Sequence, residues 1–305
     1  MTTITTSDEL PLYVDGPDGT IFTILTVPPK PNGVAVILVP AGLYGLSVNR
    51  NRFSVLLART LAASGYHALR LDLHGAGEST GDAGDNRLDV PFSGDVIAAV
   101  RRLEMMGLER FVFVGSCFGG RSCLAAAASV EGLIATAFLS VPPTDDDHSN
   151  RQIKRRAETP LQVVERGTVA RRLKGLRSRE TRARYAGIVR VKLAARAGRT
   201  ARGFESVVSP GFRTAIDGLS RRGIPTLLAY GTEPMAADFD KFSRGSELGP
   251  ILDRFGDQVE VHRPDVWLHG FPSLRAQRVG AELLDGWLTR IGLPGFDARE
   301  MVPVD

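Results

Sequence analysis

Cysteine and long apolar runs are scarce in this sequence of 305 residues. The two cysteines, Cys117 and Cys123, are six residues apart, so on a helix they would point about 240° apart. We therefore expect no disulfide, which suits a reducing cytoplasm. No apolar run reaches the roughly 18 residues that cross a bilayer, and the first ten residues lack the basic and apolar regions of a signal peptide. These absences predict a cytoplasmic protein that does not act in a membrane.

Charge is distributed unevenly along the chain. Residues 144–223 hold 20 Lys and Arg against 8 Asp and Glu, a net charge of +12, whereas the remainder holds 18 against 26, a net charge of −8. This split indicates a basic insertion in an acidic body. With 43% hydrophobic residues the body has enough apolar material for one large core. We predict a core domain made of residues 1–143 and 224–305, interrupted by a basic, mainly helical insertion at 144–223.

Strand-like and helix-like segments alternate along this body. Residues 33–39 form an unbroken, valine-rich apolar run, which is typical of a strand buried on both faces of a parallel sheet. Residues 51–64 carry apolar side chains at helical spacing. The alternation predicts an α/β fold with a doubly wound, mainly parallel sheet, in which ligands bind beyond the carboxyl ends of the strands. The other expected segments are a hairpin at 10–28, strands at 67–73, 111–114, 133–141, 226–230 and 259–263, and helices at 95–106, 121–128 and 274–291.

The segment Gly115-Ser116-Cys117-Phe118-Gly119-Gly120 follows a predicted strand and precedes a predicted helix. It has the form of a nucleophile elbow with Cys117 in the place of serine. Such a tight strand-to-helix turn leaves no room for side chains two residues on either side of the nucleophile, so glycine stands at 115 and 119. The positive end of the following helix also stabilises a thiolate. Cys117 is therefore the candidate nucleophile.

Two further motifs occur in an order known from one family. A D-x-x-G-x-G-x-S motif at 72–79 precedes the elbow, and Leu268-His269-Gly270-Phe271 lies between the last predicted strand and the final helix. With the elbow, they resemble the α/β-hydrolase fold superfamily, in its serine aminopeptidase and thioesterase-like branch, over residues 33–288 apart from the insertion. The resemblance implies the chain order nucleophile, acid, base, with Cys117 as nucleophile and His269 as base.

The acid is less clearly marked. The family's usual aspartate lies three residues after the glycine that ends the penultimate strand, and that position is Pro234 here. Glu233 is the nearest carboxylate, and Asp238 is the alternative, with Asp240 behind it. Some family members place the acid after the preceding strand, where residues 145–147 are all aspartate. We expect Glu233 to be the acid, although any of these carboxylates could instead be surface charge.

The resemblance also implies an oxyanion hole. One donor would be the backbone N–H of Phe118, the residue after the nucleophile, and the other would come from the loop at 40–43, with Gly42 as the candidate.

In this family an insertion at this point forms a lid over the site, so residues 144–223 are expected to be the lid. Its basic charge predicts an acidic partner, such as the phosphates of coenzyme A or an acidic acyl carrier protein, with Arg155 and Arg156 as candidate substrate-binding residues. A solvated helical face would explain the charge equally well. A nucleic-acid partner is not expected, because only Tyr185, Phe204 and Phe212 offer aromatic surface for stacking.

Together these features predict a thiol-dependent acyltransferase or thioesterase in which an acyl thioester acylates Cys117, with no cofactor and no metal. A second hypothesis is an ester or lactone hydrolase, because the dienelactone hydrolases also resemble this chain in having cysteine at the elbow, although they lack a large lid. The G-x-C-x-G-G box is similar to that of polyhydroxyalkanoate synthases as well. A non-catalytic binding protein on a hydrolase scaffold is the alternative from another class.

Overall fold

The computed structural model describes residues 8–42, 46–82, 84, 87–145 and 207–298. The chain divides into two compact units, the first made of residues 1–145 and 208–305 and the second of residues 146–207. All of the second unit except residue 207 lies outside the described residues, and so do Arg155 and Arg156. The predicted lid therefore stays a prediction. Residues 208–223, which the charge pattern had placed in the insertion, belong to the first unit.

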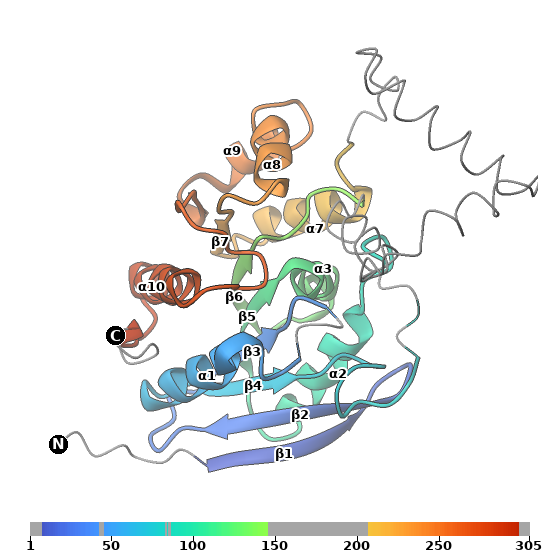
Figure 1. Cartoon of the computed structure of the whole chain (residues 1–305), viewed down its shortest axis with the longest axis vertical. Coiled ribbons are helices and arrows are strands. Elements are labelled where there is room, and N and C mark those ends of the chain that lie inside the picture. The colour runs from blue at the N-terminus through green and yellow to red at the C-terminus, as the bar shows by residue number, and fades with distance from the viewer. Residues whose placement is uncertain (1–7, 43–45, 83, 85–86, 146–206, 299–305) are drawn as a thin grey trace, which may run out of the picture. The chain divides into compact units, whose positions relative to one another are not determined.

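One eight-stranded sheet forms the first unit (Figure 1), with the strand order β1-β2-β4-β3-β5-β6-β7-β8. The β1–β2 and β2–β4 pairs are antiparallel and every later pair is parallel. The sheet therefore has the doubly wound, mainly parallel form that the alternating pattern predicts. The strands are β1 (Asp8–Asp15), β2 (Thr20–Val27), β3 (Val34–Val39), β4 (His67–Leu71), β5 (Arg110–Ser116), β6 (Leu133–Leu139), β7 (Thr226–Ala229) and β8 (Val259–His262).

Helices cover both faces of the sheet, which explains the unbroken apolar run of β3. Ala35, Ile37 and Val39 enter one core cluster and Val34, Val36 and Leu38 the other, because successive side chains of a strand point to opposite faces. The first cluster is shared with α2 (Ser93–Glu104), α3 (Cys117–Ala126), α7 (Pro210–Arg221), α8 (Met235–Ser243) and α9 (Gly249–Phe255). The second is shared with α1 (Phe53–Ala63) and α10 (Leu274–Arg290), on the opposite face (Figure 1).

Candidate active site

The predicted elbow is a tight turn between β5 and α3. Cys117 begins α3 with φ of 49°, a left-handed backbone that costs a non-glycine residue about 1–3 kcal/mol. Its side chain is buried within the core cluster on the α3 face. The first N–H groups of a helix have no carbonyl partner within that helix, so α3 begins with donors and a positive dipole end beside this thiol.

The glycines of the elbow are required by close packing. A Cβ on Gly115 would lie 2.6 Å from the Cα of Gly120. A Cβ on Gly119 would lie 2.0 Å from the carbonyl oxygen of Pro40. Only a glycine lets these backbones approach so closely. The second contact also shows that the loop after β3 packs directly on the first turn of α3.

The two predicted oxyanion donors lie near this first turn, but their N–H groups differ in whether they are already hydrogen-bonded. Phe118 is the second residue of α3, so its N–H has no intrahelical acceptor. The N–H of Gly42 donates to the carbonyl of Pro40 at 2.8 Å, and the φ of Gly42 is 92°. Gly42 would therefore donate to a substrate oxygen only after this small turn opens. The next three residues of the loop, 43–45, lie outside the described part of the chain.

Glu233 lies between β7 and α8 with only 2% of its surface exposed. Its Oε1 accepts hydrogen bonds from the N–H of Gly231 at 2.8 Å and from the hydroxyl of Ser140, and its Oε2 accepts one from the N–H of Leu268 at 3.0 Å. These bonds tie together the ends of β6 and β7 and the loop that carries His269. Three hydrogen bonds compensate for the burial of this carboxylate, so Glu233 is not a surface charge.

The other candidate acids have different surroundings. Asp238 is a half-buried residue on α8. Asp240 forms an ion pair with Arg263 at 2.6 Å, and Asp145 forms one with Arg121 at 2.6 Å. The aspartates at 146 and 147 lie outside the described residues. Among the described candidates, Glu233 is the one that accepts a hydrogen bond from the residue preceding His269.

His269 occupies a closed turn after β8. The N–H of Phe271 donates to the carbonyl of Leu268 at 3.0 Å, and the intervening Gly270 has φ of 69°. The indole N–H of Trp267 donates to the carbonyl of His269 at 3.1 Å. His269 itself is half-buried. The turn is therefore fixed by its own bonds and, through Leu268, by Glu233.

Strand order explains how these segments meet. The strands β5, β6, β7 and β8 are neighbours in the sheet and run parallel, so their carboxyl ends share one edge. Cys117, Ser140, Glu233 and the His269 turn follow these four strands in that order. The candidate nucleophile, acid and base therefore lie on three loops at one edge, as the members of a catalytic triad must. Ser140 was not predicted, because a serine after an apolar strand carries no signal in the sequence.

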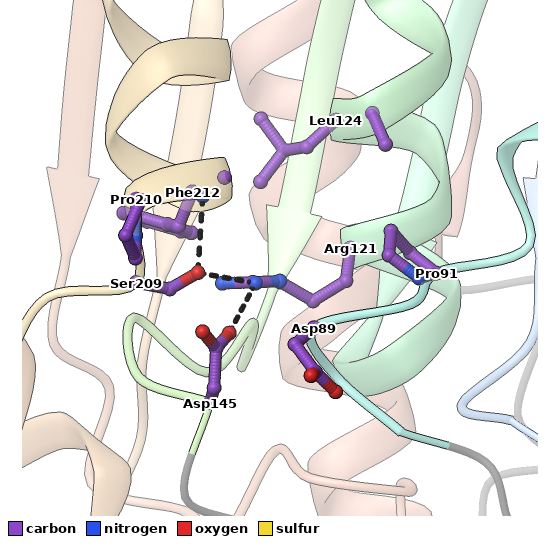
Figure 2. Close-up of a pocket in the computed structure, with 10 residues that line it drawn as sticks. Asp89, Pro91, Arg121, Leu124, Asp145, Ser209, Pro210 and Phe212 are labelled. Atoms are coloured by element: carbon purple, nitrogen blue, oxygen red, sulfur yellow. Dashed lines mark hydrogen bonds and ion pairs between the residues drawn. The ribbon is translucent and has the colours of Figure 1, made fainter.

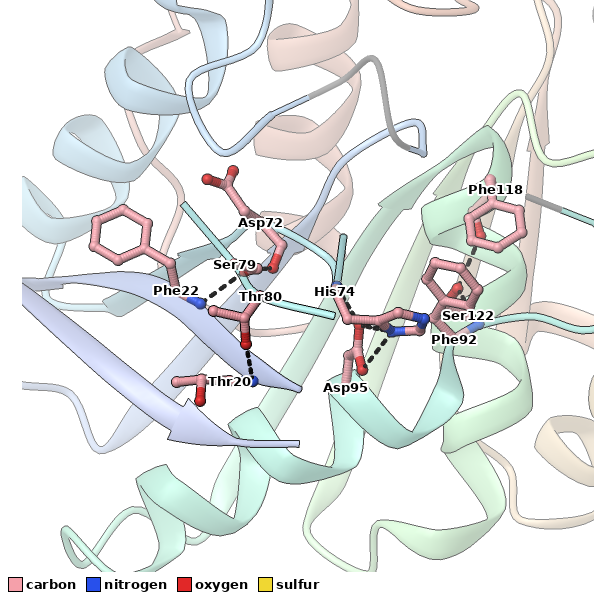
Figure 3. A network of polar contacts seen from close by, with 10 residues as sticks. All are labelled: Thr20, Phe22, Asp72, His74, Ser79, Thr80, Phe92, Asp95, Phe118 and Ser122. Atoms are coloured by element: carbon pink, nitrogen blue, oxygen red, sulfur yellow. Dashed lines mark hydrogen bonds and ion pairs between the residues drawn. The ribbon is translucent and has the colours of Figure 1, made fainter. Parts of the chain in front are cut away.

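The D-x-x-G-x-G-x-S motif supports the loop after β3. Asp72 accepts the N–H of Ser47 at 2.6 Å, and a Cβ on Gly77 would lie 2.1 Å from the Asp72 Oδ2. The hydroxyl of Ser79 donates to the carbonyl of Asp72 at 2.7 Å and accepts the N–H of Phe22 at 2.8 Å (Figure 3). The motif therefore anchors the loop after β3 and the start of β2.

His74, inside the same motif, has a structural environment of its own. Its Nδ1 lies 2.9 Å from Asp95 Oδ2, and its backbone N–H donates to the same oxygen at 2.8 Å. Burial raises the pKa of Asp95, and the bonds from His74 oppose that rise. The His74 ring packs on Phe92 at 3.8 Å between centroids, and Phe92 packs on Phe118 at 4.9 Å (Figure 3). This pair therefore supports the elbow from the side of α2.

A cavity of about 250 Å³ lies beside α3 (Figure 2). Arg121, one helical turn after Cys117, enters it with 3% of its side chain exposed. Its Nη2 donates to Asp145 and to the hydroxyl of Ser209, both at 2.6 Å. Burial lowers the pKa of Arg121, and Asp145 opposes that change. The lining does not include Cys117, Glu233 or His269, so this cavity is separate from the candidate active site.

Among the described residues, no group of three or more potential metal ligands occurs. None of their helices combines the length and the apolar character needed to span a bilayer.

Comparison with known proteins identifies the fold family. The model of the alpha/beta hydrolase fold family matches residues 34–233, and no curated protein matches the chain. An esterase from Pyrococcus furiosus is 15% identical with a TM-score of 0.55, covering 92% of this chain and 91% of the esterase. A dienelactone hydrolase from Anabaena variabilis is 14% identical with a TM-score of 0.56, covering 93% and 98%. An α/β serine hydrolase without lid from Xanthomonas campestris is 17% identical with a TM-score of 0.53, covering 94% and 96%. At these identities the structures show a shared fold, and the family match shows that the chain belongs to the α/β-hydrolase fold family.

Proposed function

We propose that the chain is a thiol-dependent acyl-transfer enzyme that works through an acyl-Cys117 intermediate. One observation carries the proposal. Cys117 has a left-handed backbone at the first residue of α3, at the sheet edge where Glu233 binds the residue before His269. A strained nucleophile position beside helix donors, a buried acid and a histidine turn is the arrangement that acyl transfer requires.

The proposed reaction has two balanced halves. His269 takes the proton from the Cys117 Sγ, and the thiolate attacks the substrate carbonyl carbon, so a C–S bond forms. The Phe118 N–H stabilises the resulting oxyanion. Collapse breaks the bond to the leaving thiol or alcohol, which receives the proton from His269. In the second half His269 takes a proton from water, which attacks the acyl-Cys117 and releases the acid and the thiol.

An acyl thioester is the proposed substrate class. Transfer from one thioester to another is nearly isoenergetic, so cysteine suits a substrate bound to coenzyme A or to an acyl carrier protein. The net charge of +12 in residues 144–223 supports an acidic partner, and Arg155 and Arg156 would be among its contacts. Either an amine or an alcohol in place of water would make the enzyme an acyltransferase.

An ester or lactone substrate is the second candidate. It is favoured by the folds that the chain resembles, which include an esterase and a dienelactone hydrolase. Both candidates use the same acyl-Cys117 step, so the leaving group separates them. A purely binding role is less well supported, because it gives no reason to keep a strained cysteine at this edge.

Intact-protein mass spectrometry tests the proposal. The full chain is mixed with acyl-coenzyme A and acyl-pantetheine thioesters, with p-nitrophenyl esters and with lactones. The variants Cys117→Ala and His269→Ala are compared with the wild type, and Cys123→Ala is the matched cysteine control. We expect an acyl adduct in the wild type and in Cys123→Ala, none in Cys117→Ala, and slow formation in His269→Ala.

The panel also decides between the substrate classes. Adducts from thioesters alone support the first candidate, and adducts from esters or lactones alone support the second. Substrate turnover that persists in Cys117→Ala contradicts the covalent mechanism. A wild type that forms no adduct and consumes no substrate of any class contradicts the proposed function.

A further inference from the structure

Gln277 connects two loops at the edge of the candidate site. It lies in the first turn of α10, and 1% of its surface is exposed. Its side-chain Nε2 donates to the carbonyl of Phe271 at 3.2 Å and to the carbonyl of Arg50 at 3.1 Å. A glutamine amide has two N–H donors, so both are used on backbone carbonyls from segments far apart in the sequence.

Both acceptors belong to strained backbone. Phe271 has φ of 47°, and Arg50 lies between Asn49 with φ of 58° and Asn51 with φ of 50°. A bulky residue such as phenylalanine is rarely found in this region. Left-handed non-glycine residues persist only where the surrounding structure holds them in place. Gln277 is one of the groups that hold both segments.

Packing around Phe271 fixes the same point. Its ring lies 4.4 Å from the ring of Phe53 on α1, between centroids. A Cβ on Gly280 would lie 2.7 Å from the Phe271 ring, so α10 presents a glycine where the ring rests on it. The ring therefore sits between α1 and α10 while the amide of Gln277 binds the carbonyl of the same residue.

The turn that carries His269 is consequently held at both ends. Glu233 binds the N–H of Leu268, the residue before His269, at 3.0 Å. Gln277 binds the carbonyl of Phe271, two residues after His269. Gln277 therefore supports the second half of the turn, together with the turn's own bonds and the packing of the Phe271 ring.

We propose that Gln277 is a positioning residue for His269: its amide ties the His269 turn to the segment at 49–52 and so sets where the imidazole stands relative to Cys117. The inference rests on the proposed function, because it treats His269 as the base. Gln277 acts through the Phe271 carbonyl.

The test is a double-mutant cycle on the full chain. Gln277→Met removes both donors at similar length, and Arg278→Ala, an exposed neighbour on α10, is the matched control. Each is made alone and in the His269→Ala background. The readouts are the rate of iodoacetamide reaction with Cys117 from about pH 5 to about pH 10, the single-turnover acylation rate with its half-saturation concentration, and the urea unfolding midpoint.

We expect Gln277→Met to slow acylation on the order of 10- to 100-fold, which is the scale for a misplaced catalytic group, with an unchanged half-saturation concentration. Its alkylation profile should move toward that of His269→Ala. In the His269→Ala background the same change should have no further effect, because the residue it positions is gone. Arg278→Ala should match the wild type throughout.

Two outcomes overturn the inference separately. If His269→Ala impairs acylation but Gln277→Met lowers only the unfolding midpoint, or slows both backgrounds equally, Gln277 is structural and this inference alone fails. If His269→Ala reacts like the wild type, the proposed function fails and the inference fails with it. Gln277→Asn, which keeps an amide one methylene short, gives the same comparison with a smaller disturbance should the Met variant not fold.

Discussion

Replacing Glu233 by glutamine tests whether this carboxylate holds the site together. The carboxylate accepts backbone N–H groups at both oxygens, from Gly231 at Oε1 and from Leu268 at Oε2, and the hydroxyl of Ser140 at Oε1. A glutamine has nearly the same shape but only one acceptor oxygen. In either orientation its NH2 group faces a backbone N–H, so one buried donor loses its partner. The serine hydroxyl can turn to accept, but a backbone N–H cannot.

The number of buried donors left without a partner sets the expected loss of stability. A buried donor without a partner costs about 1–3 kcal/mol, so Glu233→Gln should lower the free energy of unfolding by about that amount. Glu233→Ala removes the acceptor for both backbone N–H groups and leaves a cavity, so it should cost about 2–6 kcal/mol. Both variants should also slow the reaction of Cys117 with iodoacetamide, because both remove the carboxylate charge that the proposed triad uses to orient and stabilise His269.

Urea unfolding with linear extrapolation measures the stability change, and Asp238→Asn is the matched control on the adjacent α8. Asp238 is half-buried, and we expect its variant to stay within about 0.5 kcal/mol of the wild type. A Glu233→Gln protein as stable as the wild type would refute the reasoning. If Glu233→Gln loses stability while Cys117 reacts normally, and Asp238→Asn slows that reaction, the acid is Asp238.

Three further predictions follow from packing, ionisation and charge. Gly119→Ala places a methyl 2.0 Å from a backbone oxygen, so it should cost about 1–3 kcal/mol in urea unfolding and slow acylation. Its control is Gly218→Ala on α7, where a Cβ meets no atom within 4 Å and which should gain about 0.5–1 kcal/mol. Equal effects of the two changes would contradict the steric argument. Burial raises the pKa of the Cys123 thiol. Its contribution to the free energy of unfolding is therefore present below the unfolded pKa of about 8.5 and is lost above it by about 1.4 kcal/mol per pH unit. In urea unfolding, the stability of Cys123→Ala should fall less steeply with pH over that range than the stability of the wild type, and parallel curves would contradict this. Arg121→Met leaves the carbonyls of Leu88 and Pro142 without this donor and should cost about 1–3 kcal/mol in urea unfolding. Arg121→Lys should cost less, and the ion pair itself adds little because Asp145 is exposed. An Arg121→Met chain as stable as the wild type would contradict this.

Most of the sheet could be predicted from local pattern. The apolar run at 33–39 identifies β3, because a strand covered by helices on both faces needs apolar residues at every position. The boundary of α3 could not be predicted in this way. The sequence predicts a helix from residue 121, since Gly119 and Gly120 disfavour helix, yet α3 begins at Cys117. Contacts with Pro40 and Val141 require glycine at both positions, so tertiary packing overrides propensity here.

The candidate acid could not be chosen from the sequence alone. Glu233 and Asp238 are both carboxylates near the end of β7, and their spacing cannot separate them. The separation comes from a hydrogen bond to Leu268, 35 residues later in the chain. Gln277 and Ser140 carry no motif either, because their roles depend on backbone groups that only the folded chain brings to them. The helices α8 and α9 were not predicted for a related reason, since they pack on a core formed by the other elements.

The distribution of strained backbone gives an independent reason to place function at the carboxyl edge of the sheet. Among the described residues, those with a left-handed backbone and a side chain all lie in the segments that follow β3, β5, β6 or β8: Asn49, Asn51, Arg52, Cys117, Ser140 and Phe271. In the loops that lead from a helix to the next strand, at the opposite edge, the left-handed positions are glycines: Gly65, Gly107, Gly223 and Gly256. Each non-glycine case costs about 1–3 kcal/mol, and a glycine would remove that cost. Backbone strain of this kind clusters at functional sites, so its distribution supports the proposed site at the carboxyl edge.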